Sequence, residues 1–69
     1  MTIKMQSVTS SSIDKIGYRY RTMEVKFNNG RTYQFKGVPR AVFDRFAQSS
    51  SKGEFFNEQI RGSYLDRQV

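Results

Sequence analysis

MEVKFNNGRTYQFKGVP, residues 23–39, carries the clearest structural pattern in the sequence, and the rest of the fold can be predicted from it. Apolar and polar side chains alternate over residues 23–27 and again over residues 33–35, a period of two that is typical of strands with one buried face. Asn29-Gly30 between them favours a tight turn with positive φ at both central positions. We therefore predict an antiparallel hairpin whose apolar face must be covered by the rest of the chain.

A third strand is predicted just before this hairpin, at residues 13–21 (IDKIGYRYR). Its expected apolar face consists of Ile16, Tyr18 and Tyr20. Ile13 is out of phase with these residues, which indicates a β-bulge. A short connection at residues 21–22 predicts that this strand pairs with the first strand of the hairpin. The result is a three-stranded antiparallel β-meander, to which residues 3–5 allow an extra N-terminal edge strand.

Two helices are predicted after the sheet. Pro39 suits the first turn of a helix, and the apolar residues of segment 39–48 then recur at helical spacing. Ser51 and Glu54 have the spacing of a capping box at the start of a second helix, which Gly62 is placed to end. The expected architecture is a single α+β domain, residues 1–69, whose meander is covered on one face by two C-terminal helices.

Composition narrows the function classes. The 69 residues include 12 Lys and Arg against 6 Asp and Glu, a net charge of +6, and no Cys or His. The lack of Cys and His removes disulfides, thiolate zinc sites and the usual general base, so neither an enzyme nor a cofactor or metal is expected. No apolar run is long enough to span a membrane or act as a signal peptide, and we expect a cytoplasmic protein.

The positive charge favours an anionic partner, nucleic acid first. Strand alternation places five cations on the sheet face opposite the apolar one, together with the single acid Glu24. These cations are Lys15, Arg19, Arg21, Lys26 and Lys36. Because no aromatic is expected on this face, it would contact phosphates and not read bases. The alternative is a solvated sheet face whose lysines discourage aggregation between strands.

The start of the second helix offers another candidate anion site. Ser51-Lys52-Gly53 would present free N–H groups and a lysine to a phosphate, or would simply be a well-capped helix whose glycine packs closely. Asn57 and Arg61 lie four residues apart, so their side chains can meet on one helix face. They are candidates for anion binding and nucleic-acid binding respectively, or they hold the helix onto the loop at Ser11-Ser12.

The whole pattern resembles a known small domain, the KTSC domain, which is named for the C-terminal extension of certain lysyl-tRNA synthetases. The residues that carry the resemblance span about residues 8–64. They are Ser11-Ser12-Ile13, Ile16-Gly17-Tyr18, Val25, Phe27, Gly30, Tyr33, Phe35, Gly37-Val38-Pro39, Phe43, Phe46, Ser51, Gly53, Phe55-Phe56-Asn57, Ile60-Arg61 and Tyr64. The resemblance implies a stand-alone bacterial or phage member. The residue after Gly17-Tyr18 is often acidic in that family, and Arg19 in its place makes this face more basic.

Three functions follow from these patterns. The first is a nucleic-acid-binding module that contacts RNA or DNA phosphates through the basic sheet face and Arg61. The second is a protein-interaction module, such as a phage inhibitor, that docks on an acidic protein surface. The third is a small protein that sequesters an anionic nucleotide near residues 51–53. The sequence indicates neither the oligomeric state nor which partner is bound.

Overall fold

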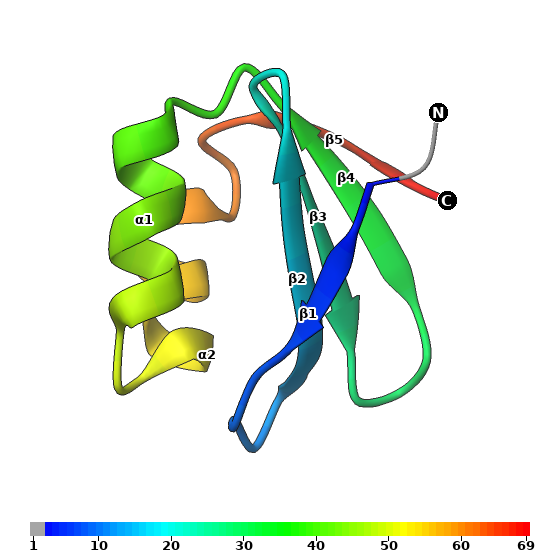
Figure 1. The fold of residues 1–69 in the computed structure, drawn as a ribbon, viewed down its shortest axis with the longest axis vertical. Helices are drawn as coiled ribbons and strands as arrows, with labels where there is room; N and C mark the ends of the chain where they lie inside the picture. Colours follow the sequence, from blue (N-terminus) through cyan, green and yellow to red (C-terminus); the bar gives the residue numbers. More distant parts are fainter. Residues whose placement is uncertain (1–2) are drawn as a thin grey trace.

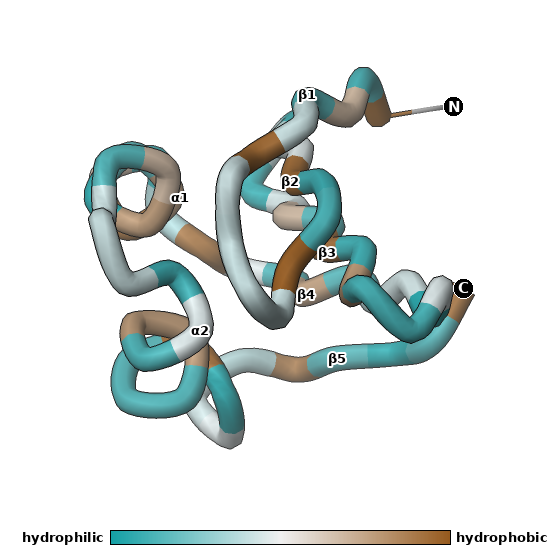
Figure 2. Tube along the Cα trace, turned by 90° about the horizontal axis from the view of Figure 1, so that it is seen from below, coloured by the Kyte–Doolittle hydropathy of each residue, from teal (hydrophilic) through white to brown (hydrophobic). Residues whose placement is uncertain are grey.

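The structure is a computed structural model that describes residues 3–69, and it consists of one antiparallel sheet with two helical segments on one side (Figures 1 and 2). The strands are β1 (Met5–Ser7), β2 (Ile13–Arg19), β3 (Thr22–Phe27), β4 (Thr32–Lys36) and β5 (Leu65–Gln68). The helices are α1 (Arg40–Gln48) and α2 (Lys52–Phe55), and α2 continues as a π-helical turn, η1 (Phe56–Ile60). Among residues 3–69, no helix has the length and apolar character needed to cross a membrane.

The α+β architecture with both helices on one face is confirmed, but the sheet has five strands and not three. Its order is β1-β2-β3-β4-β5, so every strand pairs with its neighbour in sequence. β1 is an extra N-terminal edge strand, but it covers Met5–Ser7 and shares only Met5 with the residues 3–5 that were predicted. β5 was not predicted, because all four of its residues are exposed and the strand has no alternation of buried and exposed positions.

The core lies between the sheet and the helices, as the alternation predicted. The register sets Ile16 opposite Val25, and Met23 opposite Phe35, on the face toward the helices. Phe46 of α1 is fully buried against them. The full set of buried core residues is Ile13, Ile16, Met23, Val25, Phe35, Val38, Phe43, Phe46 and Ile60. The predicted bulge is present, because the β2–β3 register shifts between Ile13 and Lys15.

The two hairpin turns differ from the predictions. Tyr20 (φ 50°) and Arg21 (φ 62°) form a two-residue turn with positive φ at both central positions, between Arg19 and its cross-strand partner Thr22. The predicted two-residue turn at Asn29-Gly30 is wrong. The β3–β4 loop is wider, Gly30 has a φ of 90°, and no other residue in that loop has positive φ. The prediction that Tyr20 joins the apolar face is also wrong, because its side chain is 79% exposed.

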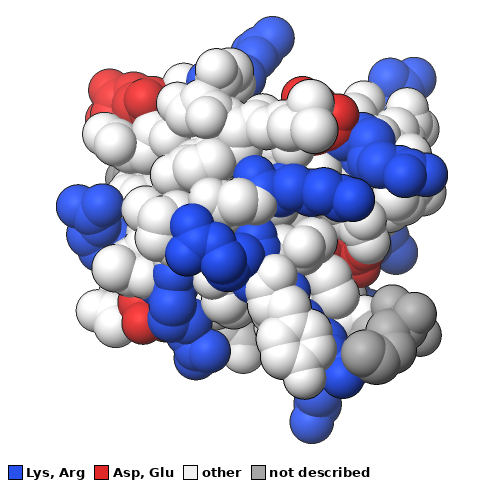
Figure 3. Space-filling view, turned by 90° about the horizontal axis from the view of Figure 1, so that it is seen from above, with Lys and Arg blue, Asp and Glu red and all other residues white. Residues whose placement is uncertain are grey.

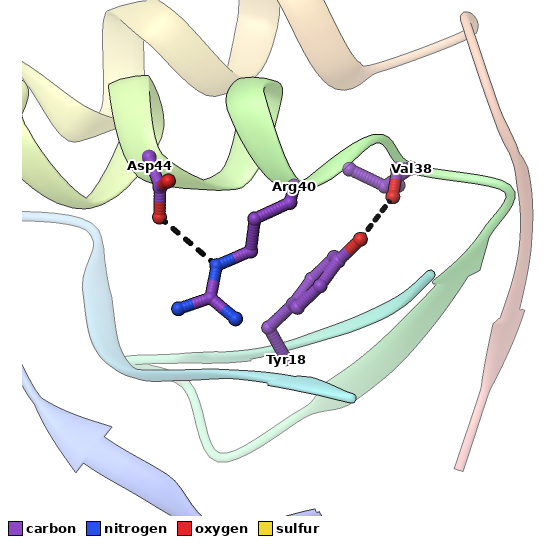
Figure 4. A network of polar contacts seen from close by, with 4 residues as sticks. All are labelled: Tyr18, Val38, Arg40 and Asp44. Atoms are coloured by element: carbon purple, nitrogen blue, oxygen red, sulfur yellow. Dashed lines mark hydrogen bonds and ion pairs between the residues drawn. The ribbon is translucent and has the colours of Figure 1, made fainter. Parts of the chain in front are cut away.

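Contacts around Tyr18 attach the start of α1 to the sheet (Figure 4). The Tyr18 hydroxyl donates to the Val38 carbonyl at 2.6 Å, and its ring stacks on Phe43 with centroids 5.0 Å apart. The Arg40 guanidinium lies 5.5 Å from the centroid of the Tyr18 ring and pairs with Asp44 at 3.2 Å. These contacts fix the helix at the end of the sheet where β2 turns into β3.

Candidate nucleic-acid interface

The sheet surface that faces away from the helices is the candidate interface. Because cross-strand partners project from the same side of a sheet, the register sorts its side chains into rows. One row runs Arg19, Thr22, Lys36, Leu65; the next runs Gly17, Glu24, Gln34, Arg67; and the third runs Lys15, Lys26, Thr32. We call this surface the basic face, defined by Lys15, Arg19, Lys26, Lys36 and Arg67.

Two lysines of the basic face lie directly opposite each other. Lys15 of β2 pairs with Lys26 of β3. Side chains in such pairs have Cβ atoms only about 4.5–5.5 Å apart, and like charges at that position destabilise a sheet. The arrangement therefore opposes folding locally, and an anion bound over both ammonium groups would relieve the repulsion.

The one acid on the basic face does not neutralise its cations. Glu24 is half-buried and accepts a hydrogen bond from Gln34 Nε2 at 2.9 Å. Within residues 3–69 the only ion pair joins Arg40 to Asp44, far from this surface in the helix layer. The five cations of the basic face are therefore available to an external ligand, apart from the contact of Arg19 with the Tyr20 ring.

The structure changes the membership of the predicted cationic set at two positions. Arg21 is not on the sheet face, because it is the second central residue of the β2–β3 turn. Arg67 joins the set, because β5 brings it opposite Gln34. Seen from the end that carries the β2–β3 turn, Lys and Arg outnumber Asp and Glu over the central part of the surface (Figure 3).

Residues before β2 cover the middle of the basic face at its β1 edge. A Cβ at Gly17 would lie 2.7 Å from Ile3 Cγ2 and 2.8 Å from Met5 Sδ, so these side chains pack directly over the glycine. Ile3 is buried although it is separate from the main core. This small apolar contact divides the end of the face carrying Arg19 from the end carrying Lys15.

A groove on the other side of the sheet collects the second group of predicted residues. It has a volume of about 1260 Å³, and aromatic rings of β3, β4 and η1 form part of its lining. The predicted site residues that line it are Ser51, Lys52, Gly53, Asn57 and Arg61, together with the serine loop 10–12. Its charged lining consists of Lys52 and Arg61 against Glu54, Glu58 and Asp66, three carboxylates against two cations.

The start of α2 does not have the geometry of a phosphate cradle. The predicted capping box is wrong, because the Ser51 side chain makes no capping hydrogen bond to the helix. Lys52 is engaged elsewhere, since its Nζ donates to the Ser49 carbonyl at the end of α1, at 2.8 Å. A cation there satisfies a carbonyl at the negative end of the helix dipole. Lys52 therefore stabilises the α1–α2 junction.

Gly53 has the close approach that its place in the first turn predicted. A Cβ at Gly53 would lie 3.1 Å from Ser12 Oγ, so the glycine lets α2 pack against the serine loop. The loop itself is a serine turn, because Ser10 Oγ accepts from the backbone N–H groups of Ser12 and Ile13. Within the described residues, the contact that joins α2 to this loop is therefore packing at Gly53.

Asn57 and Arg61 remain exposed on the rim of the groove. Among residues 3–69, neither side chain makes a hydrogen bond to the serine loop or to any other residue. The turn of chain between them is π-helical, with Arg61 N–H donating to the Phe56 carbonyl at 2.8 Å, which rotates the i and i+4 positions apart. The structure thus places Arg61 on the helix side of the sheet, away from the basic face.

Comparison with known proteins identifies relatives across nearly the full chain. The KTSC domain model matches residues 9–64. A protein of Tsukamurella paurometabola is 38% identical over 59 residues, which are 83% of this chain and 88% of that protein. The crystal structure of a KTSC domain protein from Yersinia pestis superimposes with a TM-score of 0.92 at 39% identity, covering 99% of both chains.

Proposed function

The chain belongs to the KTSC domain family, and we propose that this member is a non-enzymatic module that binds the phosphate backbone of nucleic acid through its basic face. The observation that carries the proposal is the pairing of Lys15 with Lys26, two like charges set side by side without a carboxylate between them. The pairing does not help the chain to fold, because the two charges repel each other. A phosphate that bridges both ammonium groups would explain it.

The arrangement of the remaining cations supports a ligand that is extended and polyanionic. Arg19 and Lys36 lie in the row at one end of the face, Lys15 and Lys26 in the row at the other, and Arg67 between them on β5. The charges therefore follow a surface across several strands and do not converge on one point. A nucleic-acid backbone carries charges at regular intervals along such a path.

The expected binding is independent of base sequence and sensitive to salt. The basic face consists of Lys and Arg side chains on a sheet, and within residues 3–69 both helical segments lie on the other side of that sheet (Figures 1 and 2). Contacts of this kind fix a protein on the backbone, while sequence is read through base edges. Each phosphate neutralised releases counterions, so affinity falls as salt rises.

Docking on an acidic protein is the second candidate, because one edge of the basic face has features of a protein contact. β5 is an edge strand with every residue exposed, and Leu65 at its start is 77% exposed. An exposed edge strand offers unpaired backbone groups to another chain. The third candidate, binding of an anionic nucleotide near residues 51–53, has less support, because carboxylates outnumber cations around that groove.

Chemical-shift mapping on the ¹⁵N-labelled protein would separate these candidates. Titration with tRNA is expected to shift the amides of β2, β3 and β4 at and around Lys15, Lys26 and Lys36. Titration with ATP is expected to leave residues 51–53 unshifted. Shifts confined to residues 51–61 in either titration would contradict the proposal and favour the nucleotide site. If neither ligand shifts any amide, the basic face is not a nucleic-acid site.

A further inference from the structure

The β2–β3 turn is a place where this chain adopts an unfavourable backbone conformation. Tyr20 and Arg21 have φ values of 50° and 62°, and both carry side chains that disfavour this region. Two-residue hairpin turns of this type usually use Asn or Gly, which adopt it at little cost. Strained backbone at an exposed position with bulky residues is an observation that points to function.

The surrounding structure holds the strained turn in place. The Val38 N–H donates to the Arg21 carbonyl at 2.9 Å, and the Val38 carbonyl accepts from the Tyr18 hydroxyl. Arg19 Cζ also lies 5.0 Å from the centroid of the Tyr20 ring, a cation–π distance. The ring is therefore attached to a fixed turn, with a guanidinium near one of its faces.

The Tyr20 ring does not contribute to the core. It is 79% exposed, the most exposed of the large apolar and aromatic side chains in residues 3–69. Tyr20 follows Arg19 in the turn that adjoins the row containing Arg19 and Lys36, and Arg21 follows it in the chain. An exposed aromatic ring is thus attached to the turn at the end of the proposed phosphate path that carries these cations.

We propose that Tyr20 is a stacking platform for an unpaired base, and that the ligand of the basic face is consequently single-stranded nucleic acid. The inference rests on the proposed function and adds the class of ligand to it. Every base has a π face, so an aromatic ring beside a cationic path binds single strands without sequence preference. In a duplex the bases are already stacked on one another, so no base face is free to stack on the Tyr20 ring.

Charge complementarity favours a strand over a protein segment as the occupant. Arg19 Cζ lies 5.0 Å from the ring centroid, Arg21 is the next residue in the chain, and Lys36 lies in the same cross-strand row as Arg19. No carboxylate is paired with these cations within residues 3–69. A chain with one phosphate per nucleotide places a charge next to every base. An aromatic ring with a cation beside it can bind a base and the adjoining phosphate together.

Fluorescence anisotropy with a labelled dT15 strand and a 15-base-pair duplex tests this inference. Tyr20→Asn removes the ring and places a residue that favours positive φ in the turn, so the fold is expected to survive. Tyr20→Phe keeps the ring and removes only the hydroxyl. Val69→Asn is the matched control, because it removes an exposed apolar side chain just after β5, at the end of the sheet away from the β2–β3 turn.

We expect the wild type to bind dT15 more tightly than the duplex. Tyr20→Asn should weaken dT15 binding about 5- to 100-fold, the loss typical of one stacked base, while duplex affinity changes less than about twofold. Tyr20→Phe and Val69→Asn should retain wild-type affinity for dT15. If Tyr20→Asn weakens both ligands equally or neither, or if Val69→Asn causes the same loss, the stacking role is wrong while phosphate binding stands. A wild type that binds neither ligand overturns the proposed function as well.

Discussion

Gly17 lies directly beneath Ile3, at a distance that leaves no room for a side chain at position 17. A Cβ at Gly17 would be 2.7 Å from Ile3 Cγ2 and equally close, 2.7 Å, to the Lys4 carbonyl oxygen. A side chain can rotate away from such a clash, but a backbone carbonyl cannot. The glycine therefore sets how closely the N-terminal strand packs on the sheet.

Gly17→Ala is expected to displace the segment that contains β1 from its place over β2. Crowding of this kind typically costs about 1–3 kcal/mol, here through lost burial of Ile3 and lost β1–β2 pairing. Urea unfolding measures the cost, and hydrogen exchange of the β1 amides reports the displacement. Ser7→Ala, an exposed change in the same strand, is the control. Unchanged stability with protected β1 amides would show that the contact is loose.

Phe46→Ala is expected to cost about 3–5 kcal/mol, because it removes a fully buried ring and leaves a cavity. Small domains are stable by only about 5–15 kcal/mol in total, so the variant should be close to unfolding at 25 °C. Circular dichroism during thermal unfolding provides the measurement. Leu65→Ala, at an exposed position, should unfold as the wild type does. A Phe46→Ala protein with a wild-type midpoint would contradict the packing of α1 against the sheet.

Lys52 is expected to matter more for stability than Ser51, although the sequence pattern suggests the reverse. Lys52→Met removes the bond to the Ser49 carbonyl and should cost about 0.5–1.5 kcal/mol. Ser51→Ala removes no capping bond, so its effect should stay within about 0.5 kcal/mol. Urea unfolding of the two variants side by side decides the order. A larger loss of stability for Ser51→Ala than for Lys52→Met would indicate that Ser51 does cap α2.

Tyr18→Phe tests the contact between β2 and the start of α1. Removing the hydroxyl leaves the buried Val38 carbonyl without its 2.6 Å donor, and we expect a loss of about 1 kcal/mol. Tyr20→Phe is the matched control, since its hydroxyl lies on an exposed ring. The midpoints of urea unfolding should differ between the two variants. Equal midpoints would mean that water replaces the hydroxyl without cost.

The parts of the fold that follow from burial were predictable from the sequence. The hairpin of residues 23–36 and the cover by two helices depend on apolar periodicity, and the structure confirms both. The close approach at Gly53 was also indicated, because a glycine in a first helical turn is costly unless something packs against it. In each of these features, burial or close packing requires a particular type of residue, and that residue type can be recognised in the sequence.

The features that were not predicted contain no residue of a type that indicates them. Tyr20 and Arg21 adopt positive φ because the strands on either side and the bond from Val38 N–H impose it, and neither residue type signals such a turn. β5 has no buried position, so Arg67 on the basic face was missed with it. The spacing of Ser51 and Glu54 matches a capping box, but the chain enters α2 with a geometry that leaves the serine unused.

Binding of nucleic-acid phosphates by the basic face is tested most directly by a paired measurement on Lys15→Gln/Lys26→Gln. A control variant, Arg45→Gln/Arg61→Gln, removes the same charge from the helix side of the sheet. Anisotropy titrations with a duplex over a range of salt give the log–log slope of affinity against salt, and urea unfolding gives stability.

For the lysine-pair variant, the salt dependence of binding should weaken, while stability to urea should stay the same or rise. The wild-type slope should be about −3 to −5 if most of the five cations contact phosphate, and losing two contacts should flatten it by about 2. Because the two lysines repel each other, their removal should leave stability unchanged or raise it by up to about 1 kcal/mol. The control should keep the wild-type slope. A lysine-pair variant that binds duplex with the wild-type slope and affinity would show that the basic face does not bind phosphates.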